Sequence, residues 1–376
     1  MDTTIQILIA PNAFKGSLSS LKVANAIKIG LEQRFQNIDI FPIADGGDDT
    51  LDVFLNAFSG EKIAEVVSDP LGRKIEAHWG ITQSETAIIE MAEASGIRYL
   101  KNSELDPFKA SSFGTGELIQ SAIDKGTKKM LIGIGGSATV DGGTGILKAL
   151  GAKFFRDDGS EINHGNFIVD LHSLELNDVK EKLNGVEIIV LNDVDNPLLG
   201  ENGAARVFGP QKGANDQDVE GLENYMRKYS QLMIDMCGND FSDFTGSGAA
   251  GGIGYMLKSL FGAKMEGGFD YLLKNSRLEK LIESCDVIIT GEGKIDSQTL
   301  QGKGPGRIAK LAKANGKTCI GVCGTFEPHA ELEKYFDQII PLVDEKTSEE
   351  QAMKKTFEVL KSAGGKISKI IAPKPL

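Results

Sequence analysis

The sequence predicts an α/β protein with two domains. Its 376 residues are enough for about two domains of ordinary size. Short runs of β-branched and apolar residues alternate with helical patterns near both ends of the chain, which is typical of a parallel sheet covered by helices. The middle has similar strand-like runs, separated by longer glycine-rich segments. We therefore predict a doubly wound domain built from both chain ends, with a second α/β domain inserted between them.

The first segment predicts strand, loop, helix, strand and helix in that order. Residues 5–10 form an apolar run rich in β-branched side chains, and a loop follows. Ser19 or Ser20 can cap a helix in which apolar residues recur every four positions. A second strand is expected at 38–43, and a second helix carries the apolar residues of 51–55.

The last third of the chain repeats this alternation. Strands are expected at 286–290, 318–322 and 338–343, with helices near 308–314 and 351–363. The two ends should therefore share one parallel sheet, because both show the same order of elements.

The middle region has its own strand-like runs. They lie at 87–91, 130–134 and 186–191. We place the domain boundaries so that 1–66 and 282–376 form one domain and 67–281 form the inserted one.

Composition and charge exclude several classes of partner. The chain has 41 basic and 53 acidic residues, a formal net charge of -12. An acidic protein lacks the basic face that nucleic acid or an anionic membrane surface would need. We expect a cytoplasmic protein, because no signal peptide or membrane-spanning run is visible and the four cysteines have no zinc-site spacing.

The standard nucleotide-binding signatures are absent from this sequence or only weakly matched. No Gly-x₄-Gly-Lys-Ser/Thr loop is present in the sequence, and neither is the His-Arg-Asp triplet of protein kinases. Residues 246–251 match G-x-G-x-x-G, but no convincing strand precedes them, so this dinucleotide signal is weak.

Two unusual loops lie in the N-terminal segment, each after a predicted strand. In the first, backbone N–H groups, Lys15 and Ser17 can face an anion together. In the second, Asp45, Gly46 and Gly47 suit a metal ion or a substrate hydroxyl. Taken alone, the first loop is as well explained by a solvated lysine and the second by a tight turn before a helix.

Two more such loops lie in the middle region, and both offer hydroxyl and N–H donors with little bulk, as a phosphate chain needs. The first opens a helix and the second follows the strand at 130–134. Their candidate binding residues are Ser112, Gly114, Thr115, Gly136, Ser137 and Asp141.

Acidic and glycine-rich residues also follow the later strands. Asp193 lies in the loop that begins at Asn192, directly after the strand at 186–191, where a carboxylate can hold Mg²⁺ or accept a proton. Ligands of open α/β sheets bind at the carboxyl ends of strands, which favours these positions. The further candidates are Asn196, Gln211, Lys212, Thr290, Gly291, Glu292, Gly293 and Asp296.

Together these loops resemble those of the bacterial glycerate kinase family, of the type found in glyoxylate and glucarate catabolism. Eight loops match in the same order over nearly the whole chain. They are residues 10–17, 44–50, 112–118, 135–143, 193–198, 208–214, 248–252 and 290–296.

The resemblance implies an ATP-dependent kinase that phosphorylates D-glycerate with Mg²⁺ as helper. It implies a flavodoxin-like domain made from both chain ends, a separate α/β domain and an active site between them. It favours transfer to the 2-hydroxyl, giving 2-phosphoglycerate, over transfer to the 3-hydroxyl. A homo-oligomer is left open.

Within this hypothesis Lys15 and Lys212 neutralise phosphate or carboxylate charge. Asp193 holds Mg²⁺ or accepts the hydroxyl proton, and the loops at 135–143 and 290–293 bind ligand through backbone N–H groups. Spacing alone does not decide which loop holds ATP and which holds glycerate.

Five positions depart from the family pattern. Asn12 stands where the family has Asp, Val140 where it has Asn, Asp48-Asp49 where it has Glu-Gly, and Asp195 where it has Thr. These departures keep two alternatives open: a kinase of another small hydroxy acid, or a ligand-binding relative without turnover.

Overall fold

The chain folds into two compact α/β units. A computed structural model describes residues 4–371 apart from 164, 301, 303 and 345–346. Unit 1 comprises Met1–Asp45 with Phe269–Leu376, and unit 2 comprises Gly46–Gly268. The sequence-based boundaries lay at 66/67 and 281/282, so residues 46–66 fall in unit 2 and residues 269–281 in unit 1.

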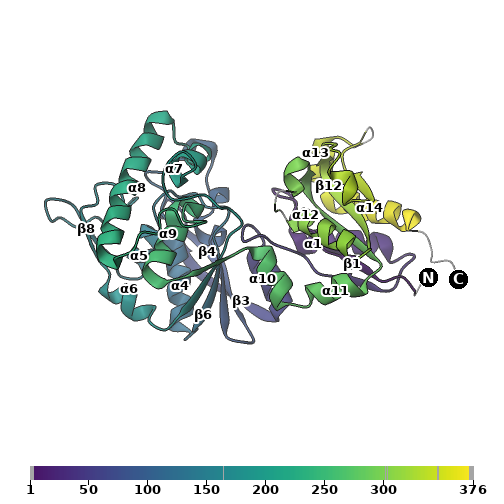
Figure 1. Cartoon of the computed structure of the whole chain (residues 1–376), viewed down its shortest axis with the longest axis horizontal. Coiled ribbons are helices and arrows are strands. Elements are labelled where there is room, and N and C mark those ends of the chain that lie inside the picture. Colours follow the sequence, from purple (N-terminus) through teal and green to yellow (C-terminus); the bar gives the residue numbers. More distant parts are fainter. Residues whose placement is uncertain (1–3, 164, 301, 303, 345–346, 372–376) are drawn as a thin grey trace. The chain divides into compact units, whose positions relative to one another are not determined.

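Unit 1 contains a five-stranded parallel sheet, of which β1 and β12 are labelled in Figure 1. The strand order is β13-β12-β11-β1-β2. Strand β1 therefore lies between β2 and β11, and β12 and β13 follow on the far side of β11. This is the flavodoxin-like order, and both chain ends contribute strands, so the predicted fold class is confirmed. The strands are β1 (Ile7–Ile9), β2 (Ile38–Ile40), β11 (Val287–Ile295), β12 (Thr318–Phe326) and β13 (Gln338–Pro341).

Helices cover both faces of this sheet. Ile7 and Ile9 face a core shared with α1 and α14, while Leu8 between them points to the opposite face and is also buried. The helices of unit 1 are α1 (Ser20–Leu31), α10 (Gly268–Asn275), α11 (Leu278–Ser284), α12 (Gly304–Ala314), α13 (Glu349–Lys354) and α14 (Thr356–Ile370), with short 3₁₀ turns at Ser297–Leu300 and Leu332–Lys334.

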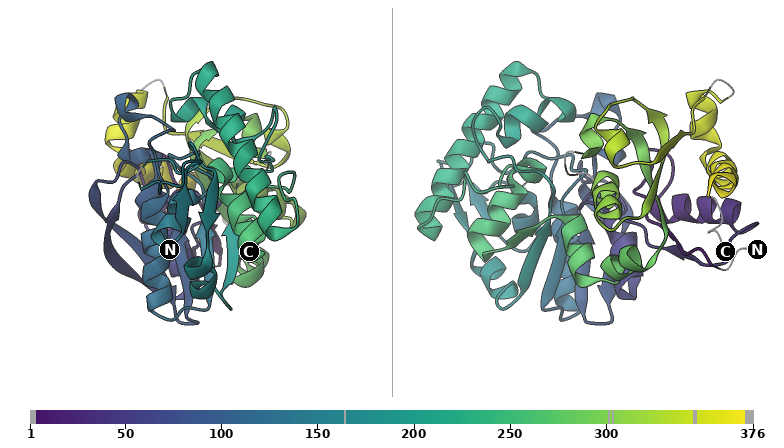
Figure 2. Two further views of the ribbon diagram at one scale, coloured as in Figure 1. Left: turned by 90° about the vertical axis from the view of Figure 1, so that its left-hand side faces the viewer. Right: turned by 45° about the vertical axis from the view of Figure 1, so that its right-hand side comes forward.

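Helices α1 and α14 lie side by side, as the purple and yellow helices of Figure 2 show. Glycine permits this close approach. A Cβ on Gly30 would lie 2.2 Å from the Lys361 carbonyl oxygen, and one on Gly364 would lie 2.3 Å from that of Ile27. The N-terminal and C-terminal segments are therefore joined by helix packing as well as by the sheet.

Unit 2 contains a six-stranded mixed sheet in the order β10-β9-β6-β5-β4-β3. Strands β10, β9, β6 and β5 are parallel, and β4 and β3 continue the sheet in antiparallel fashion. The strands are β3 (Gly60–Ser68), β4 (Lys74–Thr82), β5 (Thr86–Glu90), β6 (Lys129–Gly133), β9 (Glu187–Leu191) and β10 (Lys264–Glu266). A separate hairpin pairs β7 (Lys153–Phe155) with β8 (Ser173–Glu175).

Two helices of unit 2 lie on opposite faces of β4. The Trp79 indole N–H donates to Ser121 of α4 at 3.1 Å, whereas a Cβ on the next residue, Gly80, would meet Leu55 of α2. Successive strand residues point to opposite faces, so both faces of this sheet are covered as well. The helices are α2 (Thr50–Phe58), α3 (Ala92–Ser95), α4 (Phe113–Asp124), α5 (Thr144–Ala149), α6 (Asn177–Lys182), α7 (Ala204–Phe208), α8 (Asp216–Cys237) and α9 (Ala249–Phe261), with 3₁₀ turns at Ile97–Tyr99, Asn102–Glu104 and Pro210–Lys212.

One predicted loop is part of a strand. We expected the strand of the C-terminal segment to end at Thr290 and Gly291 to Gly293 to follow as a loop, but β11 continues to Ile295. Gly291 pairs in register with Val322, and a Cβ on Gly291 would lie 1.9 Å from the Val322 carbonyl oxygen. The glycine therefore serves close strand pairing, which the sequence pattern did not distinguish from a ligand-binding turn.

Candidate active site

Unit 1 has a cavity of about 470 Å³ that is lined by the loop after β1 and by residues 292–294 in the carboxyl-terminal half of β11. In a sheet of this order these two neighbouring strands flank the point where the strand order reverses, which is where such sheets bind ligands. Five of the predicted site residues line this one cavity: Lys15, Ser17, Asp45, Glu292 and Gly293.

The loop after β1 forms one wall of the cavity. Asn12 is buried, its N–H donates to the Gly291 carbonyl at 2.8 Å, and its side-chain oxygen accepts from the Ala13 N–H. Gly16 has a φ of 74°, which lets the chain turn back so that Lys15 is exposed at the bend. The Ser17 hydroxyl is hydrogen-bonded to the Thr356 hydroxyl. The loop is thus fixed from both sides, and its lysine is held at the cavity.

Acidic and cationic side chains at the end of β11 form a second wall. Glu292 is largely buried and accepts from the Thr299 hydroxyl at 2.8 Å, while Lys294 pairs with Asp296 at 3.2 Å. Asp296 also accepts from the Gln298 N–H, which shapes the following 3₁₀ turn. Thr290 donates to the Ala10 carbonyl at 2.7 Å and is not a lining residue of the cavity.

The remaining wall is mostly apolar. Leu342 and Val343 follow β13, and Ala352 and Met353 come from α13. The cavity therefore combines a charged end with an apolar end, as small-molecule sites commonly do.

In unit 2, two glycine-rich loops lie against each other at the carboxyl edge of the sheet. Gly46 has a φ of 94°, and a Cβ there would lie 2.4 Å from the Leu191 carbonyl oxygen. The Gly135 N–H donates to the Gly46 carbonyl at 2.9 Å, and a Cβ on Gly135 would lie 2.5 Å from Gly47 Cα. These glycines are needed because the two backbones touch.

Asp141 fixes the shape of the loop at 135–143. It is fully buried, and its carboxylate accepts from the N–H and hydroxyl of Ser112 at 2.8 Å each and from the N–H groups of Gly143 and Gly145. Burial raises the pKa of Asp141, although these hydrogen bonds act to lower it. With its oxygens committed to the protein, this predicted binding residue joins the loop to the start of α4.

Lys212 lies behind the same loop and is also almost completely buried. Its ammonium group donates to the Ser137 hydroxyl at 2.8 Å and to the Thr139 carbonyl at 2.5 Å. Burial lowers the pKa of Lys212 to about 7, and the negative charge of Asp141 opposes this effect. An ammonium group has three donors, so one remains after these two bonds.

Other predicted residues of unit 2 serve packing. A Cβ on Gly114 would lie 1.8 Å from the Ser68 carbonyl oxygen, and the Thr115 hydroxyl donates to Ser95 at 2.8 Å inside the unit. Gly136, by contrast, is exposed.

The loop after β9 presents Asp193 at the protein surface. The Asn192 side chain spans Asp193 by hydrogen bonds with both the N–H and the carbonyl of Val194. Asn196 donates to the Asn202 carbonyl, and its own carbonyl accepts from the Gly248 N–H, so that turn is held by its neighbours. Gln211 is exposed one residue before Lys212.

Comparison with known proteins decides the family. The model of the "Glycerate kinase family" matches residues 7–372. The chain belongs to the glycerate kinase family. It is 41% identical over 325 residues to the glycerate 2-kinase of Escherichia coli K12, covering 85% of each chain, and 39% identical over 345 residues to the glycerate kinase of Bacillus subtilis 168, covering 90% of each.

A solved structure supports the same assignment. The crystal structure of a "putative glycerate kinase 2" from Salmonella typhimurium LT2 superposes with a TM-score of 0.83 at 36% identity, covering 98% of both chains. The family assignment made from the sequence is confirmed, and with it the assignment as a glycerate kinase type of enzyme. A kinase family implies ATP as phosphate donor and a small molecule as acceptor.

Two departures from the glycerate kinase pattern have a structural consequence. The Val140 side chain is fully buried in the core of unit 2, and its carbonyl accepts from the Asn166 amide at 2.9 Å. Asn12 uses its side-chain oxygen within its own loop. Val140 therefore acts as a core residue here, and Asn12 as a loop residue.

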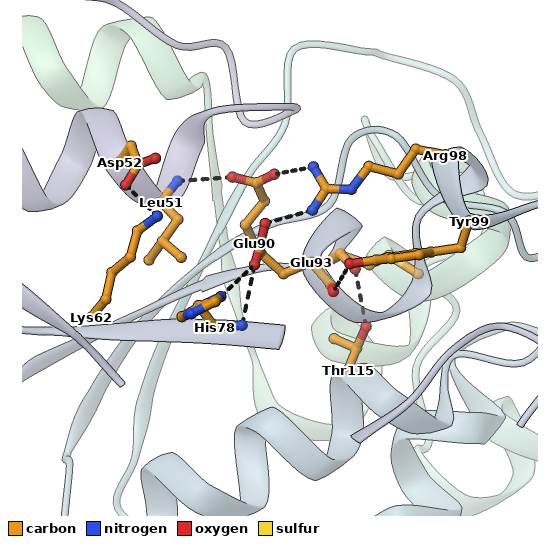
Figure 3. A network of polar contacts seen from close by, with 10 residues as sticks. Leu51, Asp52, Lys62, His78, Glu90, Glu93, Arg98, Tyr99 and Thr115 are labelled. Carbon is orange, nitrogen blue, oxygen red and sulfur yellow. Dashed lines mark hydrogen bonds and ion pairs between the residues drawn. The ribbon is translucent and has the colours of Figure 1, made fainter. Parts of the chain in front are cut away.

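Sequence reasoning missed a polar network at the end of β5, drawn in Figure 3. Glu90 accepts from the Leu51 N–H at 3.0 Å and faces Arg98 at 3.8 Å, while Arg98 also pairs with Glu93 at 2.5 Å. Glu93 accepts in turn from the His78 N–H at 3.2 Å. The available signal was a glutamate ending an apolar strand run, which we treated as part of the strand only.

In the described part of the chain, no three His, Cys, Asp or Glu side chains are grouped so that they could hold a metal ion. None of the described helices is long and apolar enough to cross a membrane.

Proposed function

We propose that the protein transfers the γ-phosphate of ATP to the 2-hydroxyl of D-glycerate, giving ADP and 2-phosphoglycerate. The observation that carries the proposal is the family match over residues 7–372. The name of the Escherichia coli relative, glycerate 2-kinase, supports the 2-position. We further propose a cytoplasmic location. A homo-oligomer stays a prediction.

Positioning and charge neutralisation account for most of the catalysis of phosphoryl transfer. The glycerate hydroxyl oxygen attacks the γ-phosphorus, the bond to the β-phosphate oxygen breaks, and the hydroxyl proton passes to a base. Asp193 is the proposed base or Mg²⁺ ligand, because it is exposed in the loop at the carboxyl end of β9, two residues after the strand ends. Mg²⁺, when bound, would neutralise phosphate charge. Lys15 and Lys212 would add cationic charge in their respective units.

The nucleotide fits the cavity of unit 1 better than glycerate does. A volume of about 470 Å³ with an apolar wall suits an aromatic base, which a three-carbon acid lacks. We propose that the base lies against Val343 and Met353 and that the phosphates lie toward Lys15. The loops near Lys212 would then serve chiefly glycerate and the transferred phosphate.

This placement is tested by Val343→Trp, which narrows the cavity at its apolar wall. We expect KM for ATP to rise at least about tenfold, equivalent to about 1.4 kcal/mol, with KM for D-glycerate within about twofold. Val359→Trp is the matched control, because Val359 packs against the same core but does not line the cavity. A rise in KM for D-glycerate alone would place the acceptor in this cavity instead.

The activity itself is tested by a coupled assay of ADP release from ATP. We expect release to depend on D-glycerate, and to be much slower with L-glycerate or lactate. Release that is equal with and without D-glycerate, or fastest with another hydroxy acid, would contradict the proposed acceptor.

A further inference from the structure

Glu90 stands where three segments of unit 2 meet. It is the last residue of β5, it pairs in register with Gly133 of β6, and only 2% of it is exposed. One glycine-rich loop follows β6 and the other precedes α2, and the two touch each other through Gly135 and Gly46. Glu90 is therefore placed beneath the carboxyl edge of the sheet, outside the set of residues so far assigned to ligands.

One oxygen of Glu90 supplies a cap that α2 lacks. The residue before this helix, Asp49, has a φ of 71° and makes no side-chain capping hydrogen bond. The Leu51 N–H in the first turn instead donates to Glu90 Oε2 at 3.0 Å. An unpaired N–H at a buried helix start costs free energy, so this carboxyl stabilises the end of the acidic loop that precedes α2.

The other oxygen of Glu90 faces charged groups. Within the described chain, Oε1 has no hydrogen-bond partner, and the nearest cation is Arg98 at 3.8 Å. The charged groups that act on Glu90 are Arg98 from the 3₁₀ turn after α3, Glu93 from α3 and Asp48 from the acidic loop. Burial raises the pKa of Glu90 to about 8. The hydrogen bond from the Leu51 N–H and the charge of Arg98 oppose this rise, and the charges of Glu93 and Asp48 add to it.

Asp48 also connects this network to the second glycine-rich loop. A Cβ on Gly136 would lie 3.2 Å from a carboxylate oxygen of Asp48. The Gly136 carbonyl accepts from the Ile97 N–H at 2.9 Å, directly before Arg98. The two glycine-rich loops and the Arg98 turn thus surround one buried carboxyl.

We infer that Glu90 is a positioning residue that fixes the acidic loop 46–49 against the glycine loop 135–137, and so sets the geometry of the carboxyl edge for phosphoryl transfer. This inference rests on the proposed function for its kinetic consequence only. In its neutral form Glu90 holds the Leu51 N–H without repelling Asp48. Ionisation strengthens the hydrogen bond from Leu51 but adds a negative charge near Glu93 and Asp48, so it changes the balance of forces that holds the acidic loop.

The test compares Glu90→Gln, Glu90→Leu and Glu93→Gln. Glutamine keeps the acceptor for Leu51 without a charge, leucine removes it, and Glu93→Gln alters the shared partner Arg98 without touching α2. We expect Glu90→Leu to lose about ten- to hundredfold in kcat, the scale of a small misplacement, with KM little changed. Glu90→Gln and Glu93→Gln should stay within about threefold of the unaltered protein.

Hydrogen exchange followed by mass spectrometry gives a readout without activity. The peptide covering the start of α2 should exchange faster in Glu90→Leu only. If Glu90→Leu does not fold, the pH profile decides: the ratio of kcat of the unaltered protein to that of Glu90→Gln should change as pH rises through about 8, because Glu90 titrates there and glutamine does not. Near-normal kcat in a folded Glu90→Leu, an equal loss in Glu93→Gln, or a constant ratio across pH overturns the inference. An inactive unaltered protein would count against the proposed function, and exchange at α2 would still test the positioning of the loop.

Discussion

Replacing Lys212 with methionine should lower kcat/KM by about two to three orders of magnitude, the scale of losing one preorganised donor to a transition-state charge. Methionine keeps a similar length and lacks the charge that is buried beside Ser137. The fold should persist, because removing a buried charge that is costly to desolvate offsets the two lost hydrogen bonds. Steady-state kinetics and thermal unfolding of the variant measure both effects.

The same lysine should produce a distinctive pH profile. Since its pKa in the folded protein is about 7, the ammonium group loses its proton above that pH, and kcat/KM should decline there. A bound anionic substrate favours the charged form, so the decline in kcat should occur at higher pH. Lys212→Met should lack this decline in kcat/KM. A decline at the same pH in the variant would show that another group titrates.

The free energy of unfolding should rise with pH, whereas kcat/KM should fall. Between about pH 7 and the ordinary lysine pKa of about 10.4, the unfolded chain holds a proton on Lys212 that the folded chain has released. The free energy of unfolding should therefore rise with pH across this window, relative to Lys212→Met. Denaturant titrations at pH 7 and pH 9.5 test the sign, and equal differences at both values would contradict it.

Asp193→Asn should lose at least about two orders of magnitude in kcat, as expected when an acid–base or metal-binding carboxylate is removed. Asparagine keeps the shape of the side chain and removes its charge. Little stability should be lost, because Asn192 brackets this position and the following turn is held by Asn202 and Gly248.

Asp195→Asn is the matched control for Asp193. Both carboxylates are exposed in the same loop, two residues apart. Asp195→Asn should keep kcat within about threefold. If both variants lose activity equally, the loop charge as a whole matters. A stable Asp193→Asn with near-normal turnover would remove Asp193 from the mechanism.

The sequence predicted the sheet of unit 1 well because its strands are short, buried and rich in β-branched residues. The runs at 5–10 and 318–322 contain β1 and the start of β12. The domain boundaries were harder to predict, because α2 and β3 follow directly after a segment whose sequence pattern is that of the first βα unit. The pairing of β3 with the next strand, β4, and of β4 with β5 places β3 in the sheet of unit 2.

The candidate site was predictable where residues lie in unusual loops, as with Lys15 and Asp45. The roles of residues that act inside the protein could not be predicted. Asp141 reads as a ligand-binding acid, yet its carboxylate accepts four hydrogen bonds from residues up to 29 positions away. Glu90 reads as part of a strand, yet it caps a helix 39 positions earlier. Such contacts depend on tertiary structure and leave no local pattern.

The most direct test of the proposed activity is phosphorus NMR of ATP, Mg²⁺ and D-glycerate incubated with the purified protein. The γ-phosphate signal of ATP should disappear as signals of ADP and one phosphomonoester appear. Comparison with authentic standards should identify that ester as 2-phosphoglycerate. Inorganic phosphate as the only new product besides ADP, or 3-phosphoglycerate alone, would contradict transfer to the 2-hydroxyl of D-glycerate.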